Sequence, residues 1–172
     1  VGDDRAAGAA GRLRVTGSIW PQVVDAVLDV LDVADLGGAR LFDGPPPADD
    51  ASPLGVAIGM PGPVDGQDIS GQTEQTWRDA GPAPFANREE TGSIGCTAWA
   101  WTGNDFTFRE LRADVRAILD AITTALAAIT PLNLPQVIGL QLHSRIEWVQ
   151  RQDERGTTVE ALFRITYAAV FS

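Results

Sequence analysis

Residues 89–126 constrain the fold more than any other part of this chain. The segment opens with small and apolar residues that alternate as in a strand, turns a short corner and continues as a helix. Thr107 stands three residues before Glu110, which is the spacing of a capping box at a helix start. Phe106 and Leu111 flank this pair as a hydrophobic staple. The segment therefore predicts a strand, a tight corner and a well-capped helix.

The helix that follows is predicted to be amphipathic and about 20 residues long. Apolar residues recur along it at spacings of three and four, and Pro131 marks its end. They are Phe108, Leu111, Val115, Ile118, Leu119, Ile122, Leu126 and Ile129. This pattern predicts one apolar stripe that packs on a core.

An earlier helix is predicted to begin at Pro21, because a proline in the first helical turn loses no hydrogen bond there. It extends to about Ala34 and stops before Gly37 and Gly38. Its apolar face consists of Val24, Val27, Leu28 and Leu31.

The middle of the chain reads as short strands joined by loops. Residues 40–42 and 54–59 are predicted strands, and the proline-rich loop 43–53 between them is expected to be stiff. Residues 60–71 contain Gly, Pro and Asp and predict a surface loop, 72–78 predict a returning strand, and 81–87 predict a second loop.

The C-terminal part has the clearest β pattern. Apolar residues alternate with polar ones in a first strand, with Ile138, Leu140, Leu142, Ser144, Ile146 and Trp148 on one face. Residues 153–156 form the turn. The returning strand alternates through Val159, Ala161, Phe163, Ile165, Tyr167, Ala169 and Phe171. The pattern predicts a long antiparallel hairpin with one buried face and one wet face.

The order helix, strands, helix, hairpin predicts an α+β fold in a single domain. We expect a mixed, mostly antiparallel sheet with two helices packed on one face and a long C-terminal β-hairpin. The chain has 172 residues, enough for one sizeable core. Residues 1–14 lack periodicity and are expected to be a flexible N-terminal arm, so the folded domain is expected to span 15–172.

The composition argues against several classes of function. A net charge of −10 disfavours a protein that grips nucleic-acid phosphates. Asp43, Asp49 and Asp50 lack the spacing of a calcium loop, and residues 59–66 match no phosphate-binding motif. With neither a secretory signal nor an 18-residue apolar run, we expect a soluble protein made in a cytoplasm, without membrane contact.

Two lone residues are candidates for a catalytic or metal-binding group. His143 is the single histidine, and no carboxylate pair or nucleophile accompanies it at a recognisable spacing. Cys96 is the single cysteine and alternates with Ile94 and Ala98, so it is interpreted as a small buried hydrophobe. We therefore expect no enzyme activity, no metal and no cofactor.

The remaining candidates are surface residues suited to protein contacts. The first predicted helix has an acidic stripe and the second a basic stripe, which are Asp25, Asp29 and Asp32, and Arg109, Arg112 and Arg116. The stripes are either solvated faces or partners of each other, within one subunit or across an oligomer interface. Trp77 and Phe85, in or next to long loops, are either core residues or interface anchors.

Several blocks of this sequence resemble the tail terminator proteins of long-tailed, siphovirus-like bacteriophages. The matching blocks are IWPQVVDAVLDVL, RLFDGPP, EETGSIGCTAWAWTG with FRELRADVRAILDAI, and the closing FRITYAAVF. The resemblance covers most of residues 15–171. It departs in the arm before Arg14 and in the loops rich in proline and glycine.

The resemblance implies structural work in a virion. Such proteins form a ring, usually a hexamer, which caps the tail tube, stops its polymerisation and joins the tail to the head. The implied partners are further copies of the chain, the tail tube protein and the head-tail connector or head-closure protein. DNA would pass through the lumen without specific binding, and assembly would take place in the host cytoplasm.

Two other classes of function stay open from the sequence. One is another neck protein of the same kind of particle, such as a head-closure or tail-completion protein. The other is a small ligand-binding or enzymatic α+β domain, which would need a deep pocket with converging polar groups.

Overall fold

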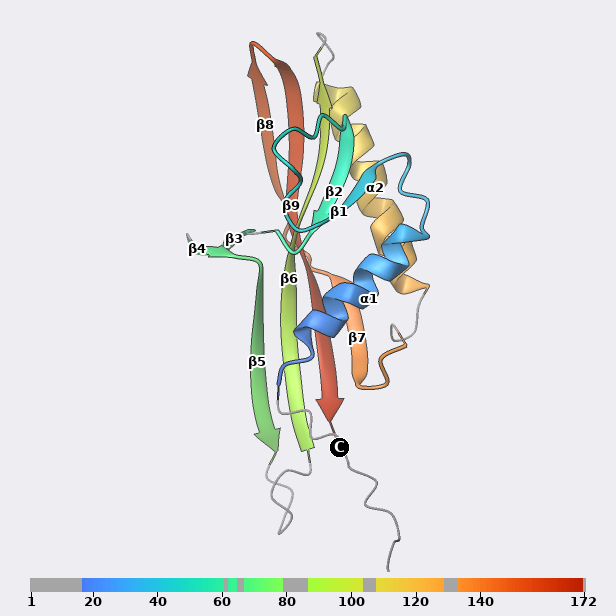
Figure 1. Cartoon of the computed structure of the whole chain (residues 1–172), viewed down its shortest axis with the longest axis vertical. Helices are drawn as coiled ribbons and strands as arrows, with labels where there is room; N and C mark the ends of the chain where they lie inside the picture. The colour runs from blue at the N-terminus through green and yellow to red at the C-terminus, as the bar shows by residue number, and fades with distance from the viewer. Residues whose placement is uncertain are drawn as a thin grey trace, which may run out of the picture.

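The computed structural model describes residues 17–60, 62–64, 67–78, 87–103, 108–128 and 133–171. These residues form two helices and nine strands (Figure 1). In chain order they are α1 (Trp20–Asp32), β1 (Arg40–Asp43), β2 (Leu54–Ile58), β3 (Gly62–Val64), β4 (Gln67–Ile69), β5 (Gly71–Arg78), β6 (Asn87–Thr102), α2 (Phe108–Ala127), β7 (Val137–Leu142), β8 (Glu147–Asp153) and β9 (Gly156–Phe171).

The main sheet is built around β6 and β9, two 16-residue strands that pair antiparallel along their whole length. The second half of β6 pairs with β2, which pairs in parallel with β1, and its first half pairs with β5. The start of β9 pairs with β8 and its end pairs with β7. The strand order is therefore β1-β2-β6-β9-β8 in one half of the sheet and β5-β6-β9-β7 in the other (Figure 1).

Gly95 marks the place where β6 changes its neighbour from β5 to β2. Its carbonyl accepts the N–H groups of Gly59 and Met60, each at 2.9 Å, and its own N–H donates to the Ser70 carbonyl at 2.7 Å. A Cβ at Gly95 would overlap the Met60 carbonyl oxygen, so only glycine permits this close approach. The hairpin of β3 and β4 leaves the sheet between β2 and β5 (Figure 1).

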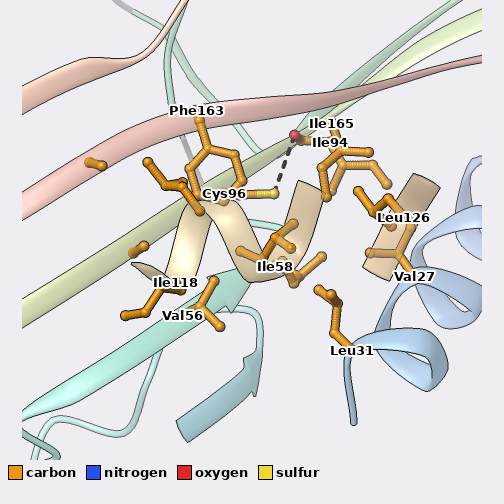
Figure 2. Packing of buried hydrophobic residues seen from close by; sticks show 14 of the residues in the cluster. Val27, Leu31, Val56, Ile58, Ile94, Cys96, Ile118, Leu126, Phe163 and Ile165 are labelled. Carbon is orange, nitrogen blue, oxygen red and sulfur yellow. Dashed lines mark hydrogen bonds between the residues drawn. The ribbon is translucent and has the colours of Figure 1, made fainter. Parts of the chain in front are cut away.

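Both helices pack on one face of the sheet, as the α+β prediction requires (Figure 1). Alternate residues of β6 and β9 turn toward the helices, including Ile94, Cys96, Phe163 and Ile165. They meet the apolar stripe of α2 and the buried face of α1 in one continuous core (Figure 2). We call the opposite side of the sheet the open face.

Both predicted helices are present with the expected buried faces, and α1 ends two residues before the predicted Ala34. The helix α2 has 20 residues, and Leu111, Val115, Ile118, Leu119, Ile122 and Leu126 are buried. Thr107, Phe106 and Ile129, which completed the predicted cap and stripe, lie outside the described residues. The helix α1 ends at Asp32, before Gly37 and Gly38, which adopt positive φ in the turn toward β1.

The prediction for residues 60–71 was wrong. They contain the β3–β4 hairpin in place of a plain loop. Its strands have three residues each, and β3 contains glycine and proline. The sequence therefore shows no apolar alternation there.

The first strand of the predicted C-terminal hairpin was wrong in part. The turn and the alternation of β9 are confirmed, but the strand that precedes the turn is split into β7 and β8 by residues 143–146. A β-bulge between Val137 and Gly139 also leaves Ile138 unpaired in the register, so Ile138 is 68% exposed and not on the buried face predicted for it. His143 lies exposed in the break and not within a strand.

Candidate assembly surfaces

The acidic stripe of α1 lies on its exposed side. Asp25, Asp29 and Asp32 are all exposed, opposite the buried Val23, Val24, Val27 and Leu31. Asp29 and Asp32 fall in the last turn of α1, which has no basic residue. The C-terminal end of a helix dipole is negative, so carboxylates there are disfavoured. Folding of one subunit gives no reason for acidic residues at this end.

The basic stripe runs from the first turn of α2, where a cation such as Arg109 is disfavoured for the same reason, to the middle of the helix. Arg109, Arg112 and Arg116 are exposed. Arg112 donates from Nη1 to Gln150 Oε1 of β8 at 2.6 Å, and Arg116 forms a 3.7 Å ion pair with Asp120 one turn along.

The two stripes do not pair with each other within one subunit. Among the described residues, no ion pair joins an aspartate of α1 to an arginine of α2. The helices meet through apolar groups, and Val27 of α1 points toward Leu126 in the last turn of α2 (Figure 2). Arg116 stands ten residues before Leu126, about 15 Å along the axis. The alternatives that remain are solvated faces or a contact between copies.

Trp148 is an exposed aromatic that the sequence placed in a buried row. It lies on β8, an edge strand, with 43% of its surface exposed. Its register partner Ala161 faces the helices, so Trp148 lies on the helix side of the sheet. The alternation of the sequence gives no signal of this exposure, because it does not show that β8 lies at an edge of the sheet.

The other two aromatic candidates are not placed by the structure. Trp77 belongs to β5, paired with Arg88 in the register, but its side chain lies outside the described part. Phe85 lies outside the described residues altogether. Their roles stay predictions.

Glu90 of β6 is a fully buried carboxylate that the sequence reading missed. Its Oε1 accepts Ser18 Oγ–H at 2.7 Å, Ile19 N–H at 3.1 Å and Tyr167 O–H at 2.7 Å. Its Oε2 accepts Gln75 Nε2–H at 2.8 Å. The alternation of β6 was the signal, since Glu90 is in phase with the buried Ile94 and Cys96.

This carboxylate serves as a cap supplied from another element. Ile19, the N-cap residue of α1, has no side chain that could accept a hydrogen bond. Glu90 accepts the backbone N–H of this N-cap residue, which is the role of the glutamate in a capping box, and it puts negative charge near the positive end of the helix dipole. Burial and the hydrogen bond to Glu90 raise the pKa of Tyr167 well above its usual range. Tyr167 is therefore a permanent donor at neutral pH.

Arg88 extends this docking of the chain before α1. Its Nη2 donates to the Gly17 carbonyl at 3.0 Å, and its guanidinium lies 4.1 Å from the ring centroid of Phe171. The polar groups of this region thus bind the entry of α1 to β5, β6 and β9.

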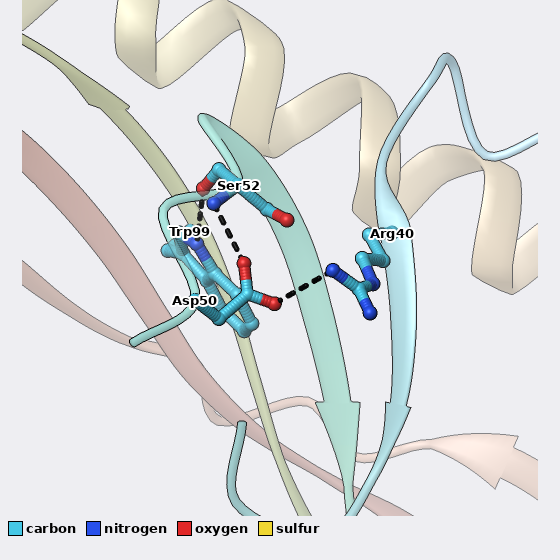
Figure 3. Close-up of polar contacts among 4 residues, drawn as sticks. All are labelled: Arg40, Asp50, Ser52 and Trp99. Atoms are coloured by element: carbon cyan, nitrogen blue, oxygen red, sulfur yellow. Dashed lines mark hydrogen bonds and ion pairs between the residues drawn. The ribbon is translucent and has the colours of Figure 1, made fainter. Parts of the chain in front are cut away.

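A second polar cluster holds the loop 44–53 on the open face (Figure 3). Arg40 forms a 3.1 Å ion pair with Asp50, the Ser52 N–H donates to Asp50 at 2.7 Å, and the Trp99 indole donates to the Ser52 carbonyl at 3.2 Å. Hydrogen bonds from the Ser52 side chain and N–H lower the pKa of Asp50. The Trp99 ring fills the space above Gly55, where a Cβ would overlap it. This cluster is structural.

The described residues offer little for catalysis or metal binding. No group of three or more His, Cys, Asp or Glu among them could hold a metal ion. His143 is exposed, and its Nδ1 accepts the Arg145 N–H at 3.1 Å. Burial raises the pKa of the Cys96 thiol to about 12, so it is not a nucleophile. In the described part, neither helix is both long and apolar enough to cross a membrane.

Comparisons with known proteins identify a shared fold. No protein-family model matches the sequence, and no curated protein matches it. Among solved structures, the chain is similar to a chain from the virion of a native gene transfer agent (GTA) particle. The two are 15% identical with a TM-score of 0.51, and the match covers 84% of this chain and 93% of the other. At this identity the likeness establishes the fold and not the function.

Proposed function

We propose that this protein is a structural component of a virion, and that it is a tail terminator. The observation that supports the proposal best is the fold shared with a chain of a gene transfer agent virion over nearly the whole length of both. The tail-terminator blocks found in the sequence correspond to α1, β1, the β6–α2 segment and β9 of this structure. In this role a ring of six copies caps the tail tube, stops its growth and binds the head-tail connector.

The distribution of polar groups supports a structural role. The buried polar network around Glu90 holds secondary-structure elements together, and Cys96 lies in the core. The charged groups exposed on the helices include the two stripes, which form no ion pair with each other among the described residues. Such surfaces suit protein assembly better than chemistry.

Net charge supports passage of DNA without binding. Each copy has a formal charge of −10, so a ring would be strongly acidic. An acidic lumen repels phosphates, and the genome would slide through it.

Deleting the gene from the particle that carries it tests the function. Without the terminator, tubes of uncontrolled length and unattached filled heads are expected in electron micrographs. Restoring the gene in trans should recover tails of one length, and a variant with Glu74→Gln on exposed β5 should recover them equally. Normal-length tails joined to filled heads in the deletion would refute the proposal.

The same micrographs separate the alternative neck proteins. A head-closure or tail-completion protein would leave tail length fixed while heads lose DNA or fail to join. Labelling of the chain at the tube end, as opposed to the connector, is the expected result for a terminator.

A further inference from the structure

We infer that the basic stripe of one copy binds the acidic stripe of the next copy, with the two helices antiparallel. The inference names the contact between subunits and rests on the proposed function only for the ring in which the contact repeats. A contact between two different patches is heterologous, and such contacts close into rings or continue as filaments.

The spacing of the charges matches in one orientation. The basic stripe advances by three and then four residues from Arg109 through Arg112 to Arg116. Read backward from Asp32, the acidic stripe also advances by three and then four, through Asp29 to Asp25. Antiparallel helices therefore pair Arg109 with Asp32, Arg112 with Asp29 and Arg116 with Asp25. In the parallel orientation the middle pair is offset by one residue.

The three charges of each stripe also lie on one side of their helix. At 100° per residue, the members of each stripe fall within a sector of about 60°. On α2, Glu110 and Asp114 lie about 100° or more from Arg112, outside this sector. Asp120 borders it and already pairs with Arg116. Both sectors are exposed in the single subunit.

The helix dipoles favour the same arrangement. Arg109 and Arg112 lie at the positive end of α2, and Asp29 and Asp32 lie at the negative end of α1. The antiparallel contact brings these ends together, so each unfavourable charge meets its counterion and the opposite helix end. Both stripes break the usual charge preference of their helices, which is expected where a partner compensates.

Trp148 gives this contact an apolar anchor. Arg112 binds Gln150, and Trp148 stands two residues earlier on the same side of β8. The strand β8 and the helix α2 run in opposite directions (Figure 1), so Trp148 lies toward Arg116. Exposed tryptophan beside arginine is the composition found at binding hot spots.

Charge reversal with mixing tests the contact in purified protein. One variant carries Arg112→Glu and Arg116→Glu, and the other carries Asp25→Arg and Asp29→Arg. Each alone is expected to self-associate about tenfold more weakly than wild type at low salt, where surface charges act most strongly. An equimolar mixture should recover association, because each variant then offers the stripe that the other needs.

Exposed arginines elsewhere on the subunit provide a matched control. Arg145→Glu with Arg151→Glu makes the same charge change on exposed residues elsewhere and should leave association unchanged. All variants should melt within a few degrees of wild type, since the residues exchanged are exposed. Single variants that associate like wild type, or a mixture that stays as weak as its components, would overturn the inference.

Cross-linking covers the case of a weakly associating wild type. Cys96 is 1% exposed, so an introduced pair reacts without interference. A chain with Arg112→Cys and Asp29→Cys, treated with a short bismaleimide at high concentration, should give a ladder of multimers. Arg112→Cys with Asp25→Cys should give far less. Ladders of equal intensity from the two cysteine pairs, or no multimers from either pair, would refute the contact. Tail length in the deletion mutant reports on the function separately.

Discussion

At the scale of single residues, Glu90 shows how hydrogen-bond donors accommodate a buried carboxylate. A buried carboxylate is costly unless its lone pairs are taken by donors. Four donors from the chain before α1, from β5 and from β9 converge on its two oxygens. Because a carboxylate only accepts hydrogen bonds, its two oxygens can take all four donors at once.

The variant Glu90→Gln tests this requirement. An amide oxygen is neutral and therefore a weaker acceptor for Ser18, Ile19 and Tyr167, and the amide nitrogen would force Gln75 to turn its own oxygen toward it. We expect a loss of about 1–2 kcal/mol in the free energy of unfolding, measured with urea. The same change at exposed Glu74 on neighbouring β5 should cost less than about 0.5 kcal/mol. Equal effects of the two substitutions would contradict the account.

At the scale of elements, the two 16-residue strands β6 and β9 give the fold its shape. The strands β6 and β9 each serve two sets of neighbours, one set at either end. The change of neighbour along β6 requires two backbone segments to reach Gly95 from the same side. The β3–β4 hairpin lies in the chain between these two segments.

Gly95→Ala should disturb this junction. The new Cβ would overlap the Met60 carbonyl oxygen, which belongs to the backbone and cannot rotate away. We expect a loss of about 1–3 kcal/mol in unfolding free energy. Gly139→Ala is the control, because a Cβ there meets nothing within 4 Å. Should both variants unfold at the same denaturant concentration, the junction does not depend on glycine.

At the scale of the whole molecule, one core lies between the sheet and its two helices. The two side chains that titrate between neutral pH and the range of arginine are both in it, since the chain has one cysteine, one tyrosine and no lysine. Cys96 ionises only when the core opens, which links its chemistry to global unfolding.

The consequence is a loss of stability in alkali. Burial raises the pKa of Cys96 from 9.0 to about 12, and the pKa of Tyr167 moves in the same direction. The unfolded thiol loses its proton first. The contribution of Cys96 is therefore complete below about pH 9 and is lost as pH rises toward 12.

Thermal unfolding between pH 7 and pH 11 measures this effect. The midpoint should fall above pH 9, and Cys96→Ala with Tyr167→Phe should flatten the fall while lowering stability at every pH. A midpoint that is constant to pH 11 in the parent would show that neither group loses its proton on unfolding.

The sequence by itself determined the elements whose period is local. The helix α2, the buried face of α1 and the alternation of β9 follow from spacings of 3.6 and 2, which depend on backbone geometry alone. The helical period also places the three aspartates and the three arginines on exposed helix faces. It also gave the α+β class, because the order of elements leaves few ways to bury those faces.

The tertiary structure decided what depends on residues far apart in the chain. The change of neighbour at Gly95, the β3–β4 hairpin and the bulge at Ile138 arise from pairing between strands, which no local period encodes. Glu90 became a cap only because folding brought Ser18 and Ile19, more than 70 residues earlier, to its oxygens. Trp148 is exposed on the edge strand β8, and which strand lies at an edge depends on how distant strands pair.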